Sequence, residues 1–369
     1  MNPGNKSSIA IVDGYGPHRE EVCKALLSFY DASAYDDGKT ALKSLTVNPP
    51  ALILVGEQVS PGGGLNFIKA LRQERSLNQV PIIYIVDHDS YQAMADSKAA
   101  GAEGYIAKPY RRSALIKTIS KQLNASIEHE WEALPVIQKQ ALQGSVDVFN
   151  NLADSLSTGE PLPFDSVKGA CGPLVEAIGN NDFKSILNGV KNHDDYTYAH
   201  SMRVATMLSL LGHAAGFKKD EQLLLASGGL LHDVGKMMIP HSVLNKPGRL
   251  TEEEFEVMKS HVPETIKYLK DSGDIPKAIF IIAEQHHEKL NGMGYPNGLK
   301  GSQLNQLARM AAVVDVFSAL TDRRVYKAPM EAEKAIAIME DEMTDHLDQR
   351  LVKMFKGMLG DADILNETD

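Results

Sequence analysis

Short apolar runs alternate with stretches of helical period over the first 120 residues. Continuous apolar runs such as 51–55 and 81–86 are typical of strands buried on both faces of a parallel sheet. The predicted strands are 9–12, 32–35, 51–55, 81–86 and 104–107, and the predicted helices are 22–29, 40–45, 65–72, 90–100 and 112–123. This alternation predicts a doubly wound, flavodoxin-like α/β domain over 9–120, preceded by a disordered tail at 1–8.

From about residue 121 the strand pattern ends and helical period takes over. Residues 121–155 are polar and amphipathic and are interrupted at Pro135, which predicts a connector made of two helices. After a loop expected at 156–164, the predicted helices are 201–212, 219–232, 251–269, 275–287, 304–320 and 329–343. Thr251 followed by Glu254 is typical of a capping box that opens a helix. We therefore expect an all-α bundle over 156–369.

Composition limits the classes of function. The 369 residues are 43% hydrophobic and 23% charged, with a net charge of −10, which argues against a nucleic-acid polymer as partner because phosphate backbones need a basic face. A small nucleotide remains compatible, since its phosphates could be met locally. There is no secretion signal and no apolar run long enough for a membrane span, so we expect a cytoplasmic protein. The two cysteines, Cys23 and Cys171, predict no disulfide framework.

The all-α part carries imidazole and carboxylate side chains on helices far apart in sequence. They are His200, His232, Asp233, His261, His286, His287 and Asp315. Neutral imidazole and carboxylate bind divalent first-row metals, and helical bundles build such sites from several helices. Asp315 is informative by itself, because a carboxylate in an apolar run is costly to bury unless it is paired or metal-bound. The set suits two metal ions, which together can activate a water and hold a phosphodiester.

The pair His232-Asp233 closes a strongly apolar predicted helix. Neighbours on a helix point about 100° apart, so each can face a different ion, or Asp233 can bridge two. Lys236 lies four residues after His232 on the same predicted face, where its ammonium could hold a phosphate oxygen. Single histidines on helices are usually surface or satisfied core residues, and we place His213, His241 and His346 in that class.

Residues from about 190 to 330 resemble the HD-GYP family, a branch of the HD phosphohydrolases that hydrolyse cyclic di-GMP. The order and spacing of the matching stretches agree with that family throughout. The stretches are His200-Ser-Met-Arg-Val204, Leu230-Leu-His-Asp-Val-Gly-Lys236, 239–240, 244–251, His261, His286-His-Glu288, Gly292-Met-Gly-Tyr-Pro296, Ala311-Ala-Val-Val-Asp315 and 319–321.

The resemblance implies a role for each matching residue. One ion would be held by His200, His232, Asp233 and Asp315, and the other by Asp233 as a bridge with His261, His286 and His287. Asp233 and Lys236 would act in catalysis. Tyr295, Arg324 and Lys327 would contact the dinucleotide. Some members hold a third ion through a Glu at the position of Tyr196, so we expect two ions here, drawn from Fe, Mn, Ni and Zn.

The expected reaction is hydrolysis of cyclic di-GMP to pGpG, with onward cleavage to GMP left open. Family members commonly carry Arg, Trp, Asp and Ser where this chain has Lys289, Leu290, Asn291 and Met293, and Ser318 replaces a usual Asp. These departures bear on substrate preference and turnover more than on metal binding. Two alternatives therefore stay open: a phosphodiesterase that prefers cyclic GMP-AMP, and a cyclic-dinucleotide-binding scaffold with little turnover.

Residues 9–120 resemble a response-regulator receiver domain, in which a phosphorylated aspartate works with two acidic residues, a Ser or Thr and a Lys. This chain keeps Asp13 and Lys108. The phosphoacceptor position holds Gly56, or Glu57 after a one-residue shift, so we predict no phosphoacceptor. Gly14 and Val86 replace the second acid and the hydroxyl residue. We expect a pseudo-receiver that serves dimerisation or docking, hence a homodimer and a protein partner bound through this domain.

Overall fold

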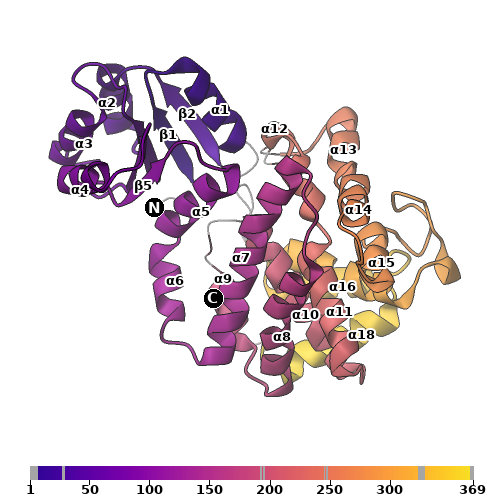
Figure 1. The fold of residues 1–369 in the computed structure, drawn as a ribbon. Helices are drawn as coiled ribbons and strands as arrows, with labels where there is room; N and C mark the ends of the chain where they lie inside the picture. The colour runs from indigo at the N-terminus through magenta and orange to yellow at the C-terminus, as the bar shows by residue number, and fades with distance from the viewer. Residues whose placement is uncertain are drawn as a thin grey trace. The chain divides into compact units, whose positions relative to one another are not determined.

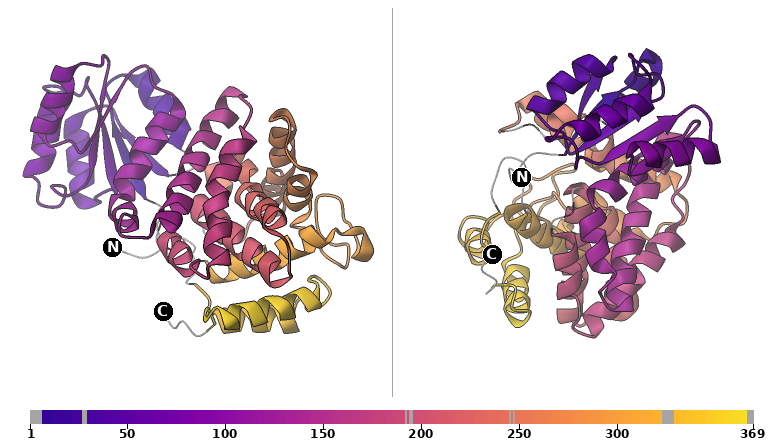
Figure 2. Two further views of the ribbon diagram at one scale, coloured as in Figure 1. Left: turned by 60° about the horizontal axis from the view of Figure 1, so that its bottom comes forward. Right: turned by 90° about the vertical axis from the view of Figure 1, so that its left-hand side faces the viewer.

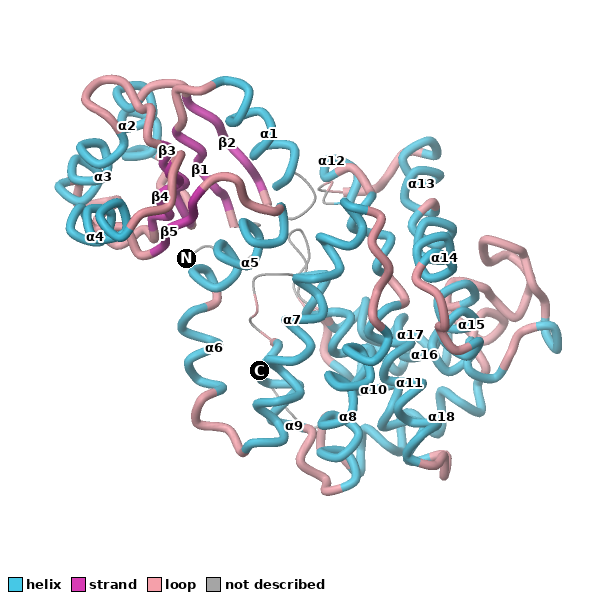
Figure 3. The backbone as a smooth tube through the Cα atoms, in the orientation of Figure 1, coloured by secondary structure: helices cyan, strands magenta, loops and turns pink. Residues whose placement is uncertain are grey.

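The computed structural model describes residues 7–26, 30–191, 193, 196–244, 246, 248–322 and 329–365. The chain divides into two compact units, Met1–Glu128 and His129–Asp369 (Figure 1). Every strand that the structure describes lies in the first unit, and the second is built from helices and loops (Figure 3). Among the described residues, no helix combines the length and the apolar character needed to cross a membrane.

The first unit contains a parallel five-stranded sheet in the order β2-β1-β3-β4-β5. The strands are β1 (Ser8–Val12), β2 (Asp31–Tyr35), β3 (Leu52–Gly56), β4 (Ile82–Val86) and β5 (Gly104–Ala107). Each lies within one residue of its predicted position. This strand order is the flavodoxin-like form of the doubly wound fold, so the predicted fold class of this part is confirmed.

Helices cover both faces of the sheet, as the left view of Figure 2 shows. On one face, side chains of β1, β3 and β4 pack with α1 (Gly16–Leu26) and α5 (Arg112–Leu123). On the other face, the alternate side chains of the same strands pack with α2 (Gly38–Val47), α3 (Gly64–Gln73) and α4 (Tyr91–Ala100). Strands β1, β3 and β4 are thus buried on both sides, which explains their unbroken apolar runs.

The second unit is helical, as predicted. Its elements, starting from the helix that crosses the division between the units, are α6 (Ala125–Trp131), α7 (Val136–Thr158), α8 (Phe164–Gly179), α9 (Lys184–Val190), α10 (Tyr196–Ala214), α11 (Lys219–Leu231), η1 (Val234–Met238), α12 (His241–Leu244), α13 (Glu252–Lys259), α14 (His261–Asp271), α15 (Lys277–Gln285), η2 (Gly301–Gln303), α16 (Gln306–Thr321), α17 (Ala332–Asp341) and α18 (Gln349–Asp361). Helices α10, α11, α15 and α16 pack in a ring at the centre of this unit, each against two of the others.

The prediction of one helix over 251–269 was wrong, because α13 and α14 are separate helices that meet at Ser260. Pro263 has no backbone N–H and cannot donate to the carbonyl of Lys259, which interrupts the helical hydrogen bonds at this point. The interruption makes His261 the first residue of α14. The capping box predicted from Thr251 and Glu254 is present at the start of α13.

The helix predicted over 219–232 also ends earlier, at Leu231, and the 3₁₀ helix η1 follows Asp233. Gly235 lies in η1, and a Cβ atom there would stand 2.1 Å from the carbonyl oxygen of His261. Only glycine permits this close approach. The approach brings η1 and the start of α14 together, and with them the segments that carry Asp233 and His261.

Candidate metal centre

The ring of helices in the second unit brings the predicted metal ligands together in two groups. The ligand atoms of Asp233, His261, His286 and His287 lie within 4.8 Å of one another, and so do those of His200, His232 and Asp315. His200 comes from α10 and Asp315 from α16, while the other five stand at helix ends. The two groups have the members expected for two ions, with Asp233 between them.

Asp233 directs one carboxylate oxygen at each group. Its Oδ1 lies 3.2 Å from Nε2 of His261 and 3.7 Å from Nε2 of His286. Its Oδ2 lies 3.1 Å from Nε2 of His232 and 3.7 Å from Nε2 of His200. This is the arrangement that a carboxylate bridging two ions requires.

Several polar atoms in these groups are buried and have no hydrogen-bond partner among the described residues. Within the described part of the chain, Oδ1 of Asp233 and Nε2 of His232, His261 and His286 have no hydrogen-bond partner, since their mutual contacts lack hydrogen-bond geometry. One such atom costs about 1–3 kcal/mol, so four in one place need a compensating ligand. A divalent cation accepts lone pairs from imidazole nitrogen and carboxylate oxygen alike, and the residues present therefore fit a metal centre.

The other ring nitrogens hold the imidazoles in the orientation that metal binding needs. Nδ1 of His232 donates to the carbonyl of Gly229 at 2.7 Å, and Nδ1 of His261 donates to that of Met258 at 2.7 Å. Nδ1 of His286 lies 3.0 Å from the carbonyl of Ala283. A proton on Nδ1 leaves the lone pair on Nε2, which faces the centre.

The charges also suit metal binding. Burial and the neighbouring His232 lower the pKa of His286 to about 3. Burial and the neighbouring His286 lower the pKa of His287 well below its usual value, so both rings are neutral. Burial raises the carboxyl pKa of Asp233, but the electrostatic interactions with His232 and Lys236 outweigh it and hold that pKa well below its usual value.

Asp315 and His200 form a second electrostatic pair. Nε2 of His200 lies 3.1 Å from Oδ1 of Asp315. Burial raises the pKa of Asp315, yet the hydrogen bond to His200 outweighs it and keeps the carboxylate ionised. Burial likewise lowers the pKa of His200, but the hydrogen bonds to Asp315 and Asp322 outweigh it and raise that pKa to about 9.

Asp322 is a residue that the sequence reasoning missed. Its Oδ2 lies 2.7 Å from Nδ1 of His200, and its Oδ1 accepts from Arg203 at 2.8 Å. The second guanidinium nitrogen of Arg203 donates to Thr321 at 2.8 Å. A signal was present: Asp322 follows Asp315 by seven residues, two helical turns, and Arg203 follows His200 by three.

Lys236 reaches the centre by a different route from the one predicted. It lies in η1, not on a continuation of α11, and its ammonium contacts Oδ2 of Asp233 while keeping some exposure. The tighter 3₁₀ turn brings the side chain back over the residue three positions earlier. Lys236 therefore contacts Asp233 and keeps part of its side chain open to solvent.

Of the three predicted dinucleotide contacts, the structure places Tyr295 at the centre. Its ring lies 4.7 Å from that of His287 and 6.4 Å from that of His261. Burial raises the pKa of its hydroxyl, and the charges of Asp233 and Asp315 raise it further. Tyr295 is thus a permanent hydrogen-bond donor at ordinary pH. Arg324 and Lys327 lie outside the described residues.

Glu288 supports the loop that carries Tyr295. It is buried, and its carboxylate accepts from the backbone of Asn297 at 2.7 Å and of Leu299 at 2.9 Å. Gly294 passes so close that a Cβ there would stand 2.4 Å from Cα of Glu288. Contacts with Glu288 therefore hold the loop at both ends of the Gly-Tyr-Pro stretch.

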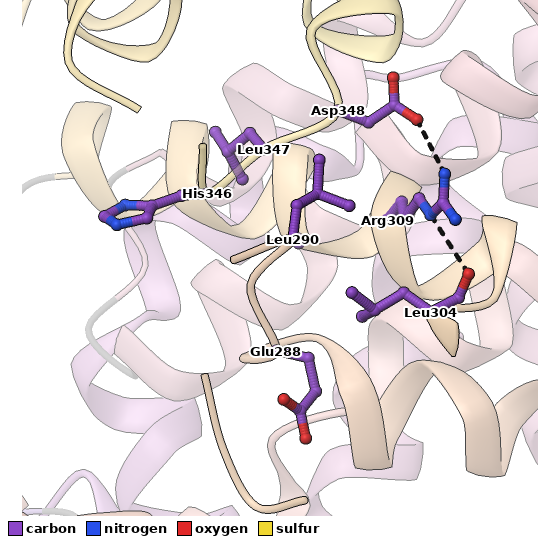
Figure 4. A pocket seen from close by; sticks show the side chains of 8 residues that line it. Glu288, Leu290, Leu304, Arg309, His346, Leu347 and Asp348 are labelled. Atoms are coloured by element: carbon purple, nitrogen blue, oxygen red, sulfur yellow. Dashed lines mark hydrogen bonds and ion pairs between the residues drawn. The ribbon is translucent and has the colours of Figure 1, made fainter. Parts of the chain in front are cut away.

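Two residues of this loop that differ from the family pattern contact the segment before α18. The backbone of Leu290 donates to the carbonyl of His346, and the Asn291 side chain donates to Asp345, both at 3.0 Å. Figure 4 shows Leu290 next to Arg309, which donates to Leu304 and pairs with Asp348, while Glu288 lines the same pocket further from Arg309. The cavity between these side chains measures about 10 Å³, so this region is packed support for the loop.

Comparison with known proteins follows the division into two units. The family model of the response regulator receiver domain matches residues 9–120, and that of the HD domain matches residues 185–351. The chain is a receiver domain joined to an HD domain. The predicted family and fold class are thereby confirmed.

Curated relatives of the HD domain are phosphodiesterases by name. A cyclic di-GMP phosphodiesterase of Pseudomonas aeruginosa is 38% identical over 46% of this chain and 41% of its own length. A 3′3′-cGAMP-specific phosphodiesterase of Vibrio cholerae is 34% identical over 44% of this chain and 35% of its own. The chain thus spans less than half the length of these two relatives.

Two further similarities extend beyond the HD domain. The cyclic di-GMP phosphodiesterase response regulator RpfG of Xanthomonas campestris is 29% identical over 88% of this chain and 79% of its own length. Among solved structures, an HDG"Y"P protein of Bdellovibrio bacteriovorus shares the fold, with a TM-score of 0.51 and 21% identity over 67% of this chain and 81% of that one.

In the receiver domain, the position where phosphorylation would take place is closely packed. Asp13 accepts from the backbone of Tyr15 at 2.9 Å and lies 2.6 Å from Nδ1 of His18. A Cβ on Gly56 would stand 2.7 Å from the Asp13 carboxyl carbon, and one on Gly14 would stand 2.0 Å from the carbonyl oxygen of Gln58. Neither glycine has room for the carboxylate of a working receiver.

The remaining receiver residues are also engaged elsewhere. Lys108 pairs with Asp87 at 3.0 Å, and Glu57 accepts from the backbone of Asp87 at 3.0 Å. Lys108, which would contact a phosphoryl group, and Glu57, at the alternative acceptor position, are therefore both bound to Asp87.

Proposed function

We propose that the HD domain hydrolyses a phosphodiester bond of a cyclic dinucleotide, with cyclic di-GMP as substrate and pGpG as product. The proposal rests on the geometry of Asp233, whose carboxylate directs one oxygen at each of two histidine groups. The names of the relatives supply the substrate class.

We propose that two divalent ions, drawn from Fe, Mn, Ni and Zn, occupy the centre. His200, His232, Asp233 and Asp315 would hold one, and Asp233, His261, His286 and His287 the other. When bound, such a pair would lower the pKa of a water molecule, which makes hydroxide available as the nucleophile at neutral pH. It would also neutralise charge on the phosphoryl oxygens. The buried nitrogens without hydrogen-bond partners in the described chain support this assignment.

The chain's own residues orient the substrate. Lys236, held beside Asp233 and partly exposed, binds a non-bridging phosphate oxygen and stabilises the charge that grows there as the nucleophile adds. Tyr295, protonated and next to His287, donates a hydrogen bond to the phosphate or to the ribose beside it. Asp233, His232 and His286 are buried, so the centre approaches the phosphate from a side closed to bulk water.

The test is hydrolysis of cyclic di-GMP by the full chain with Mn²⁺ or Fe²⁺, with the products separated by chromatography. We expect metal-dependent formation of pGpG and its loss in the double variant His232→Ala, Asp233→Ala. Bound metal without turnover of any cyclic dinucleotide would refute the proposal and favour the scaffold alternative.

The second candidate substrate is cyclic GMP-AMP. It is favoured by the relative from Vibrio cholerae, and both molecules offer the same phosphodiester chemistry to the centre. Rates for the two substrates, measured in parallel and in competition, decide between them.

We further propose that the receiver domain acts without phosphorylation, as a docking module for a protein partner or a second copy of this chain. The close packing around Asp13 and Gly56 supports this role. We expect no aspartyl phosphate after incubation with a small phosphodonor or beryllofluoride and Mg²⁺. Stoichiometric labelling would overturn this proposal, and light scattering of the full chain tests the homodimer.

A further inference from the structure

A line of aromatic rings runs outward from the metal centre. Tyr295 lies 4.7 Å from His287, and Phe255 lies 6.1 Å from Tyr295, edge to face. Phe255 is 45% exposed. The line therefore begins at a predicted metal ligand and ends in a ring that is open to solvent.

The contact with Tyr295 leaves much of the Phe255 side chain uncovered. It belongs to α13, in which no residue is buried. The helix is held by its capping box at Thr251 and by the ion pair of Lys246 with Glu254 at 2.5 Å. Phenylalanine usually contributes to a core, so its exposure on a helix beside a candidate site points to a ligand.

Lys259, one helical turn after Phe255, adds a positive charge to the same place. Its ammonium lies 5.2 Å from the ring centre of Phe255 and 5.9 Å from that of Tyr295. It also pairs with Glu256 at 2.6 Å, whose side chain is largely exposed. Such an exposed pair contributes little energy and is easily exchanged for another acceptor.

We propose that Phe255 and Lys259 read one base of the dinucleotide, and that this base is guanine. The proposal rests on the proposed function. A purine stacks on the exposed ring of Phe255 while its phosphate lies at Lys236 and Tyr295, which are nearer the metal centre. Lys259 donates to O6 and N7 at the edge of the base, acceptors that guanine offers together and adenine does not.

The first test is the kinetics of Phe255→Ala on cyclic di-GMP. Stacking on an aromatic ring accounts for roughly a five- to hundredfold change in affinity, so we expect KM to rise about tenfold with little change in kcat. Phe255→Trp should restore KM. Val257→Ala is the matched control, because Val257 is also partly exposed but lies about 200° around the helix from Phe255.

The second test uses bases other than guanine. Lys259→Ala should reduce the preference for cyclic di-GMP over cyclic di-AMP, measured as the ratio of kcat/KM values, by about tenfold. A cyclic dinucleotide carrying 2-aminopurine should lose fluorescence on binding to the wild type and keep it with Phe255→Ala. This readout reports stacking without turnover.

The outcomes separate this inference from the function on which it rests. An unchanged KM in Phe255→Ala, or an unchanged substrate ratio in Lys259→Ala, overturns the inference while wild-type hydrolysis upholds the function. A metal-loaded wild type that cleaves no cyclic dinucleotide overturns both.

Discussion

Asp322 accepts a hydrogen bond from His200, with 2.7 Å between Oδ2 and Nδ1. This contact holds a proton on Nδ1 of His200, on the side away from the candidate metal centre, and points Nε2 at Asp315. A carboxylate behind a metal-ligating histidine is a common device for fixing the ring and strengthening the ligand. The geometry suits Asp322 to the same task at the candidate metal centre.

Replacing Asp322 should weaken metal binding without removing a ligand. We expect Asp322→Ala to lower affinity at the His200 group about 10- to 100-fold, as measured by competition with a chelator of known affinity. Asp361→Asn, an exposed carboxylate on α18, is the control and should bind as the wild type does. Equal affinities in Asp322→Ala and wild type would show that His200 does not depend on this contact.

The raised pKa of His200, about 9 in the metal-free protein, predicts proton release on metal loading. At pH 7.5 the ring is protonated, and a cation at Nε2 must displace a proton. Apparent affinity should therefore rise with pH, by up to about tenfold per unit below pH 9. Calorimetry in two buffers of different ionisation enthalpy measures the released proton, and its absence would contradict the assignment.

The same group makes a prediction for stability. Its folded pKa lies above the unfolded value of about 6.5, so its contribution is fully present below pH 6.5 and is lost as pH rises through about 9. Metal-free protein should therefore unfold at lower denaturant concentration at pH 9 than at pH 6.5. His200→Gln should lose less of its stability over this range, and an equal loss would exclude His200 as the cause.

In the receiver domain, Gly56 and Asp13 should be coupled. A Cβ on Gly56 meets the Asp13 carboxyl carbon at 2.7 Å, so Gly56→Ala should destabilise the domain by about 1–3 kcal/mol. Asp13→Ala removes the obstructing carboxylate, and the double variant should recover part of the loss. Thermal unfolding of the four proteins gives the coupling energy. If the changes in unfolding free energy of the two single variants simply add, Gly56 does not pack against the Asp13 carboxylate.

Glu288 should matter for substrate binding more than for metal binding. Glu288→Ala leaves the N–H groups of Asn297 and Leu299 without their acceptor and so loosens the loop that carries Tyr295. We expect a raised KM with unchanged metal content, measured by steady-state kinetics and elemental analysis. Glu333→Ala, an exposed carboxylate on α17, is the control. Loss of metal in Glu288→Ala would show instead that the histidine pair depends on it.

The strands and most of the central helices could be predicted because their apolar patterns are local. Strands β1, β3 and β4 are buried on both faces, and Asp315 could be singled out because it interrupts an apolar run. The break at Ser260 was missed because the sequence pattern of 251–269 stays amphipathic across Pro263. The end of α11 was missed because tertiary contact at Gly235, and no local signal, decides it.

The residues that orient the candidate ligands could not be predicted from local sequence patterns. Asp322 and His200 are separated by 122 residues, and only the packing of α10 on α16 brings them together. The contacts of Leu290 and Asn291 with the segment before α18 are equally long-range. The side-chain chemistry named the ligand candidates and the family resemblance assigned them to two ions, but the residues that orient them required the fold.

The central claim is that Asp233 bridges two ions. Metal content after reconstitution with Mn²⁺ and removal of free ion tests it most directly, on wild type and Asp233→Ala in parallel. Two ions per wild-type chain and at most one in a folded Asp233→Ala, with loss of cyclic di-GMP hydrolysis, is the predicted result. Two ions retained by Asp233→Ala would contradict the claim.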